Sequence, residues 1–365
     1  MSEALLNELF PGKNFRILEN GLLTEARSRL DSLTKPRGSL GRLEEMAARL
    51  FAIVGGCRPL RVDPALMLTV AADHGVACQK VSPFPQIVSR QMVENFLSGG
   101  AAINALCNSA GMHLRIVDAG CAGGSFCAHP LLLDRRIGNG TQDLSKGPAM
   151  ERGQCVTALR NGFELAEEAV ANGYACLGCG EMGIANSTAA SALFCAFLGL
   201  EPEAVVGPGA GADAKMQAHK REIVASALKV AHSTLASGNP LTILAALGGF
   251  EIATLAGIML GCASCHIPVL VDGFICTAAF VSARAFFPDL SQFAFLAHSS
   301  AEPGFNIILA QMPDVAPPLL QLQMRLGEGT GCAVALPILR AATAIFNEMT
   351  TMTAAAVQAE EKDRV

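Results

Sequence analysis

One glutamate stands between two glycines in a segment bounded by apolar residues on both sides. This residue is Glu328, which lies within residues 324–331 with Gly327 before it and Gly329 after it. Glycine lets the backbone bend tightly and leaves the neighbouring carboxylate open to close approach by another molecule. Two interpretations follow: a solvated surface turn, or a general base that accepts a proton from a bound substrate.

A glycine-rich segment in the middle of the chain is a second candidate site. Residues 178–183 match G-x-G-x-x-G, follow an apolar run, and have Glu201 about 20 residues further on. The pattern is typical of a dinucleotide site, and hence of an oxidoreductase. It also fits a loop whose amides hold a phosphate at the start of a helix near Asn186. Glu181 disfavours the first interpretation, because its charge would lie beside a pyrophosphate.

Cysteine and histidine motifs are present, and each has a structural alternative. Residues 262–266 match the haem-attachment pattern C-x-x-C-H, which we treat as a coincidence. Cys176 and Cys179 could bind zinc with further ligands, but Cys176 lies in an apolar run, which favours core packing. Asp73 and His74 are neighbours at a strand end and face opposite ways, so structural hydrogen bonds are favoured over a catalytic dyad. The sequence therefore predicts no metal and no cofactor.

The composition limits the class of protein. Of 365 residues, 51% are hydrophobic and 16% are charged, and the net charge is -5. This charge argues against a broad nucleic-acid-binding surface. The apolar runs fall short of the ~18 residues that span a membrane, and the acidic N-terminus does not resemble a signal peptide. We expect a cytoplasmic protein without a membrane span, whose 13 cysteines are mostly reduced core residues.

Four short apolar segments end in polar or small residues, as the strands of a parallel sheet do. They are residues 66–72, 114–117, 174–177 and 269–271. Continuous apolar strands that alternate with helices are typical of a sheet covered on both faces. We predict an α/β fold with a parallel, Rossmann-like sheet, helices on both of its faces, and a ligand site beyond the carboxyl ends of the strands.

Both ends of the chain have helical patterns. Residues 2–52 show helical periodicity, and an alanine-rich apolar stretch covers residues 333–357. We expect the charged residues 360–364 to form a frayed end. The predicted division is a small helical domain from residues 1–60 and 315–365, and a large α/β domain from residues 61–314 that carries most of the ligand site.

Several motifs occur in an order that resembles one enzyme family. They are KPRGSLGRLE (35–44), ADHGV (72–76), GPAM (147–150), GEMGIAN (180–186), VDGF (271–274), HSSAEP (298–303) and RLGEGTG (325–331). Each motif alone is weak, but the ordered set runs from about residue 33 to 352 and is specific. The chain resembles the nicotinate-nucleotide:dimethylbenzimidazole phosphoribosyltransferase family, which activates the lower-ligand base in cobalamin synthesis.

The resemblance implies a reaction and an assembly. The phosphoribosyl group of nicotinate mononucleotide would pass to a ring nitrogen of 5,6-dimethylbenzimidazole, giving α-ribazole 5'-phosphate and nicotinate with inversion at the anomeric carbon. No metal or other cofactor is implied. The assembly would be a homodimer, or a pair with a homologous subunit. Alternatives remain open: a homologue that activates a phenolic base, a nicotinamide-dependent oxidoreductase, or a catalytically silent subunit.

The same resemblance implies roles for individual residues. Glu328 lies at the position of the family's catalytic base, and burial of its carboxyl group should raise its pKa. Glu181 matches a second acidic residue near the ribose. The further substrate-binding positions are Ser82, Phe84, Gly180, Met182, Gly183, Asn186, Lys220, Arg325 and Leu326.

One position departs from the family pattern. Some members have a glutamine where this chain has Met92. We expect a polar contact to the base from Gln86 or Gln91, or none at all. Together with Phe84 and Met182, this substitution leaves the choice of base open.

Overall fold

The computed structural model describes residues 2–357, so the predicted frayed end at residues 360–364 lies outside them. A parallel sheet of six strands, in the order β3-β2-β1-β4-β5-β6, organises the fold. The strands are β1 Ala65–Ala72, β2 His113–Gly120, β3 Leu132–Asp134, β4 Cys176–Met182, β5 Val269–Val271 and β6 Ala294–Leu296. The α/β prediction is confirmed, although the three-residue strands β3 and β6 were not predicted.

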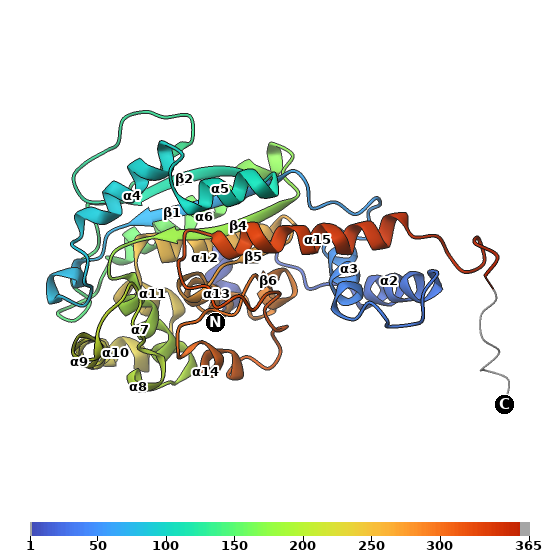
Figure 1. Cartoon of the computed structure of the whole chain (residues 1–365). Coiled ribbons are helices and arrows are strands. Elements are labelled where there is room, and N and C mark those ends of the chain that lie inside the picture. The colour runs from blue at the N-terminus through green and yellow to red at the C-terminus, as the bar shows by residue number, and fades with distance from the viewer. Residues whose placement is uncertain (1, 358–365) are drawn as a thin grey trace.

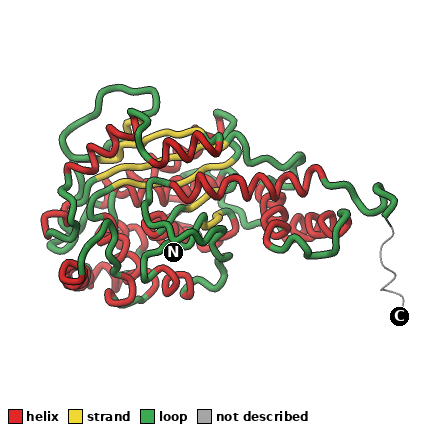
Figure 2. The backbone as a smooth tube through the Cα atoms, in the orientation of Figure 1, coloured by secondary structure: helices red, strands yellow, loops and turns green. Residues whose placement is uncertain are grey.

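Helices cover both faces of the sheet, as predicted (Figure 1). One face carries α4 Ile87–Leu97, α5 Ala102–Ala110 and α15 Thr330–Glu348, and the other carries α6 Arg152–Ala171, α12 Phe250–Ser264 and α13 Phe274–Phe286. Every residue of β1 is buried, which explains its continuous apolar sequence. The tube in Figure 2 shows the strands enclosed between the two helical layers.

The connection between β4 and β5 adds a further group of helices. They are α7 Asn186–Leu198, α8 Pro202–Val205, α9 Ala214–Val230, α10 His232–Ala236 and α11 Pro240–Leu247. Three shorter elements lie elsewhere: η1 Gly75–Gln79, η2 Pro288–Gln292 and α14 Phe305–Ala310. Because α7 packs against both α13 and α9, this group forms an extra layer beside the carboxyl ends of the strands.

Helices from both chain ends pack together. The helices α2 Asn20–Ser32 and α3 Arg42–Ile53 contact each other, and α3 packs on α15 (Figure 1). The Arg29 guanidinium donates to the Phe346 carbonyl at 2.6 Å. By contrast, α1 Ser2–Leu9 contacts α13, and the Phe10 ring stacks on Phe163 of α6 at 4.3 Å. The domain boundaries stay a prediction, but these contacts group the first residues with the sheet.

The long apolar segment near the C-terminus forms a core helix. It was expected over residues 333–357, whereas α15 runs from Thr330 to Glu348. Among the described residues, α15 alone is long and apolar enough to cross a membrane by length and composition. More than half of that apolar window is buried, and the helix packs against β4, β5, α3 and α5.

Strand β4 ends later than the sequence predicted, and two glycines that were expected in a loop therefore lie in the strand. It continues to Met182, so Gly178 and Gly180 lie within the strand and not in a loop. A Cβ at Gly180 would lie 2.3 Å from the Glu328 carbonyl oxygen. The dinucleotide interpretation is wrong, because it requires these glycines in the turn after the strand. They let other backbone and side-chain atoms approach the strand closely.

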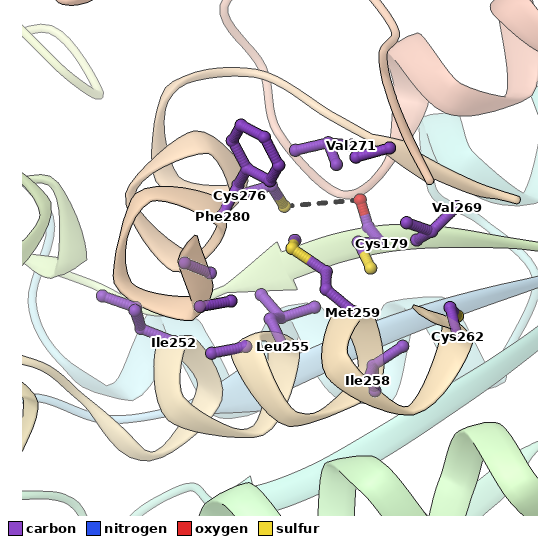
Figure 3. Packing of buried hydrophobic residues seen from close by; sticks show 14 of the residues in the cluster. Cys179, Ile252, Leu255, Ile258, Met259, Cys262, Val269, Val271, Cys276 and Phe280 are labelled. Carbon is purple, nitrogen blue, oxygen red and sulfur yellow. Dashed lines mark hydrogen bonds between the residues drawn. The ribbon is translucent and has the colours of Figure 1, made fainter. Parts of the chain in front are cut away.

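Sulfur-containing side chains lie among aliphatic and aromatic ones between β4, α12 and α13 (Figure 3). Cys179, Met259, Cys262 and Cys276 are all buried there, and the Cys276 thiol donates to the Cys179 carbonyl at 3.3 Å. Burial raises the pKa of each of these thiols, which keeps them neutral. The predicted core role is confirmed. No group of metal ligands is formed within residues 2–357.

Two helices on one face of the sheet cross with their backbones in close contact. A Cβ at Gly162 of α6 would lie 1.9 Å from the Thr254 carbonyl oxygen, and one at Gly257 of α12 would lie 2.1 Å from the Leu159 carbonyl oxygen. Any side chain at either position would force the helices apart. This packing holds α12 against β1 and β4.

We expect Gly162→Ala to lower the free energy of unfolding by about 1–3 kcal/mol, because the added methyl group overpacks a backbone contact. Urea denaturation measures this loss. Gly153→Ala on the same helix is the control, because its Cβ would meet no atom within 4 Å. That variant should keep or gain up to about 1 kcal/mol. Equal losses in the two variants would contradict the proposed role of the crossing.

Candidate active site

A cavity of about 350 Å³ opens at the carboxyl ends of the strands, where the parallel sheet predicted a site. Its lining comes from segments that follow β1, β4, β5 and β6, and from the loop that precedes α15. The strand order reverses between β1 and β4, because the chain builds outward to β3 and then returns to the other side of β1. The ligand site therefore lies at the topological switch point of the sheet.

The loop that carries Glu328 is buried and tightly held. Gly327, Glu328 and Gly329 have φ angles of 88°, 63° and 96°, all in the left-handed region. The Glu328 N–H donates to the Glu181 carbonyl at 3.2 Å, and the Glu328 carbonyl accepts from the Thr69 hydroxyl at 2.8 Å. Since Glu328 is only 5% exposed, the interpretation as a solvated turn is wrong.

The Glu328 carboxyl group faces both the cavity and the first turn of α5. Its Oε2 atom accepts from the Ile103 N–H at 3.2 Å. Burial raises the pKa of this carboxyl group, the Ile103 hydrogen bond opposes the shift, and the negative charge of Asp272 adds to it. The expected rise in pKa is therefore present, and it strengthens the group as a proton acceptor.

Glu181, at the end of β4, brings a second carboxyl group to the same cavity. It is 8% exposed, and its Oε2 atom accepts from the Asn186 amide at 2.5 Å. A Cβ at Gly327 would lie 2.2 Å from its Oε1 atom, so the Glu328 loop passes directly over it. Burial, followed by nearby carboxylates, raises the pKa of Glu181 to about 8.

Part of the cavity lining is suited to an anion. Residues 183–187 line the cavity where α7 begins, and Ala185 has a left-handed φ of 74°. Lys220 lies behind this wall and donates from its ammonium group to the Ser187 hydroxyl at 2.8 Å. Burial lowers the pKa of Lys220 to about 8, against the opposing charge of Glu302. Amides at a helix start with a cation behind them favour phosphate.

Another part of the lining is apolar. It includes Phe84, Val88, Met92, Met182 and Leu326. Phe84 and Leu326 are 48% and 59% exposed, so they lie at the mouth of the cavity. An aromatic side chain together with aliphatic and thioether side chains suits the binding of an aromatic ring.

Most of the residues singled out from the sequence line the cavity. They are Ser82, Phe84, Met92, Glu181, Met182, Gly183, Asn186, Arg325, Leu326 and Glu328. Gly180, Gln86, Gln91 and Lys220 do not. The Gln86 amide turns back to the His74 carbonyl at 3.5 Å, and Gln91 is exposed one position before Met92 on α4. Neither glutamine lines the cavity. Gln91 and Met92 are successive helix positions, and only one of the two can face it.

Several lining residues were not assigned to the site from the sequence. They include Ser187, His298, Ser300 and Glu302. Asp272, directly after β5, accepts a hydrogen bond from the Gly329 N–H in the Glu328 loop. The sequence did show Asp272 at a strand end. The segment 298–302 is part of a family motif, but its position after a strand was missed because the three-residue strand β6 was not predicted.

Asp73 and His74 face opposite ways, as strand geometry predicted. The Asp73 Oδ2 atom accepts from the Ala122 N–H at 2.7 Å, whereas the His74 Nε2 atom lies 2.7 Å from the Glu251 carboxylate. Neither residue lines the cavity. Their hydrogen bonds stabilise the segments that surround it.

Comparisons with known proteins agree with this geometry. A family described as phosphoribosyltransferase matches residues 16–357. A nicotinate-nucleotide-dimethylbenzimidazole phosphoribosyltransferase from Nitratidesulfovibrio vulgaris is 53% identical over 340 residues, which cover 93% of this chain and 95% of that protein. The protein of the same name from Geobacter metallireducens is 45% identical, with coverage of 94% and 96%.

A solved structure shows the same fold. The crystal structure of the corresponding phosphoribosyltransferase from Thermus thermophilus matches with a TM-score of 0.87 and 41% identity, covering 94% of this chain and all of that one. Sequence and fold thus agree over nearly the whole length. The chain belongs to the nicotinate-nucleotide-dimethylbenzimidazole phosphoribosyltransferase family.

Proposed function

We propose that this enzyme transfers the phosphoribosyl group of nicotinate mononucleotide to 5,6-dimethylbenzimidazole and releases nicotinate. One observation carries the proposal: two buried carboxyl groups, Glu181 and Glu328, share a cavity whose lining combines apolar side chains with the start of α7. A nucleotide donor and a flat aromatic acceptor require these two environments on either side of the reacting carbon.

We infer positions for the two substrates from the two kinds of lining. The 5'-phosphate of the nucleotide would bind at the start of α7, beside residues 183–187, with the Lys220 charge transmitted through the Ser187 hydroxyl. The acceptor ring would lie among Phe84, Met92 and Leu326. The anomeric carbon would then sit between Glu181 and Glu328.

The proposed chemistry follows from the charge of the leaving group. The bond between the anomeric carbon and the pyridinium nitrogen breaks, and its electron pair neutralises that nitrogen. The acceptor nitrogen attacks from the opposite face, which inverts the configuration. Its other ring N–H loses a proton to the Glu328 carboxylate, so no net charge remains on the azole. A positioned base in this role contributes about 10²- to 10⁴-fold.

Glu181 has a different proposed role. With a pKa of about 8 it holds a proton in much of the free enzyme at neutral pH. A cationic pyridinium or a cation-like anomeric carbon nearby favours its ionised form. Glu181 would therefore hydrogen-bond the ribose hydroxyls and stabilise positive charge as it develops.

The apolar part of the lining favours an alkylated aromatic acceptor. Phe84, Met92 and Met182 present apolar side chains, which suit the two methyl groups of dimethylbenzimidazole. A phenolic acceptor and a nicotinamide dinucleotide gain no support from any observed contact. Retention of both carboxyl groups in the cavity also counts against a catalytically silent subunit.

We further propose that the enzyme works as a homodimer in the cytoplasm. Phe84, Ile87, Leu322 and Leu326 are apolar and between 48% and 59% exposed, and two of them lie at the cavity mouth. A second copy that covered them would remove this surface from water. Sedimentation equilibrium of the purified chain should give twice the 37.9 kDa monomer mass. A monomer at micromolar concentration would contradict the proposal.

We expect the purified enzyme to release nicotinate from nicotinate mononucleotide only when dimethylbenzimidazole is added. Glu328→Gln should lower kcat by at least about tenfold and leave the KM for the nucleotide largely unchanged, because glutamine keeps the shape but accepts no proton. Chromatography of released nicotinate measures both. Glu348→Gln, exposed at the end of α15, is the matched control and should behave as wild type. An unimpaired Glu328→Gln variant would refute the role as base.

The value of kcat/KM for the nucleotide should fall above about pH 8, the pKa to which burial lowers Lys220. Below this pH the ammonium is charged and attracts phosphate; above it the charge is lost. Lys220→Met should abolish this alkaline limb and lower kcat/KM below about pH 8, and the two enzymes should converge above it. Glu181→Gln should keep the limb. If Glu181→Gln removes it instead, the titrating group is Glu181.

A further inference from the structure

We propose that Asp272 is a positioning residue that holds the Glu328 loop in the geometry needed for proton transfer. This inference rests on the proposed function, in which Glu328 is the general base. Asp272 does not itself line the cavity, so it acts through the loop.

The contacts of Asp272 are with the backbone of the loop. Its carboxylate directly follows β5 and is 1% exposed. The Oδ2 atom accepts from the Gly329 N–H at 3.0 Å, and the Oδ1 atom accepts from the Gly331 N–H at 2.8 Å. One side chain thus anchors both backbone amides that flank the start of α15.

The loop requires such anchors because its backbone is strained. A glutamate with a φ of 63° is unfavourable, and conformations of this kind cost about 1–3 kcal/mol. They persist only where surrounding contacts determine them. The Thr69 hydroxyl holds the Glu328 carbonyl and the Glu181 carbonyl holds the Glu328 N–H. With Asp272, the three adjacent strands β1, β4 and β5 each supply one anchor.

The loop rests directly on these anchors without a side chain between them. A Cβ at Gly331 would lie 2.1 Å from the His298 ring and 2.6 Å from the Asp272 Oδ1 atom. A Cβ at Gly329 would lie 2.5 Å from the Met67 sulfur. Glycine at both positions is therefore what lets the two amides reach the Asp272 carboxylate.

Asp272 also sets the charge around the site. The groups that face it are His298 after β6, Glu181 on β4, Glu328, and the neutral thiols of Cys179, Cys276 and Cys332. The His298 Nε2 atom lies 3.3 Å from the Asp272 Oδ1 atom. Burial alone would lower the pKa of His298, but the hydrogen bond and charge of Asp272 raise it overall. The charge of Asp272 also raises the pKa of both Glu181 and Glu328.

Asp272→Asn tests the proposal by removing the charge and one acceptor while the shape is kept. We expect kcat to fall by at least about tenfold with little change in the KM for nicotinate mononucleotide. The acid limb of kcat against pH should move to lower pH, because loss of a nearby negative charge lowers the pKa of Glu328. Loss of structure alone would not shift this limb.

Asp118→Asn is the matched control. Asp118 on β2 is also 1% exposed and accepts two backbone N–H groups, from Gly120 at 2.9 Å and Cys121 at 2.8 Å. It does not line the cavity or contact the Glu328 loop. We expect its kcat and acid limb to match the wild type, whatever its thermal stability. If Asp272→Asn behaves in the same way, the proposal is overturned.

Asp272→Glu separates geometry from charge, and it decides the matter if Asp272→Asn does not fold. The longer side chain keeps the charge but displaces the carboxylate, so kcat should fall while the acid limb stays in place. Wild-type kcat in this variant would overturn the proposal. Glu328→Gln is assayed alongside: if it is unimpaired, the assignment of the base has failed. If it is slow while both Asp272 variants are normal, only the role of Asp272 has failed.

Discussion

The close contact between the Glu328 loop and the sheet is the constraint on which the site depends. A Cβ at Gly180 would lie 2.3 Å from the Glu328 carbonyl oxygen, so only glycine lets the loop lie on β4. This approach brings the Glu328 N–H within 3.2 Å of the Glu181 carbonyl. The two carboxyl groups of the site are thereby fixed relative to each other by backbone contacts, which are less variable than contacts between side chains.

Burial of acidic groups gives the site its chemical character. Glu181, Glu251, Asp272 and Glu328 are all under 9% exposed. Two of them are paired with buried histidines: Glu251 with His74 at 2.7 Å, and Asp272 with His298 at 3.3 Å. Glu181 and Glu328 have no such cation and keep raised pKa values. The site therefore offers proton acceptors and negative potential to a donor that carries a pyridinium cation until its glycosidic bond breaks.

The order of the strands explains why distant segments meet at this cavity. In a parallel sheet all carboxyl ends lie at one edge, and the reversal of strand order between β1 and β4 leaves that edge open. The segments after β1, β4, β5 and β6 then reach one cavity, although they are spread over the chain. The start of α15 completes it, because this helix packs on β4 and β5 from the opposite face to α13.

The sequence by itself determined a parallel sheet with four of its six strands, the position of the site at its carboxyl edge, and Glu328 as the candidate base. Apolar strand segments and ordered motifs carry this information locally. The sequence did not determine where β4 ends, that Gln86 and Gln91 point away from the cavity, or that Asp272 anchors the Glu328 loop. Glycines in an apolar run predict a turn as well as a strand, and local sequence does not say what packs against them. Only the tertiary structure decided this, because the atoms that approach Gly180 and accept from Gly329 belong to segments more than 50 residues away along the chain.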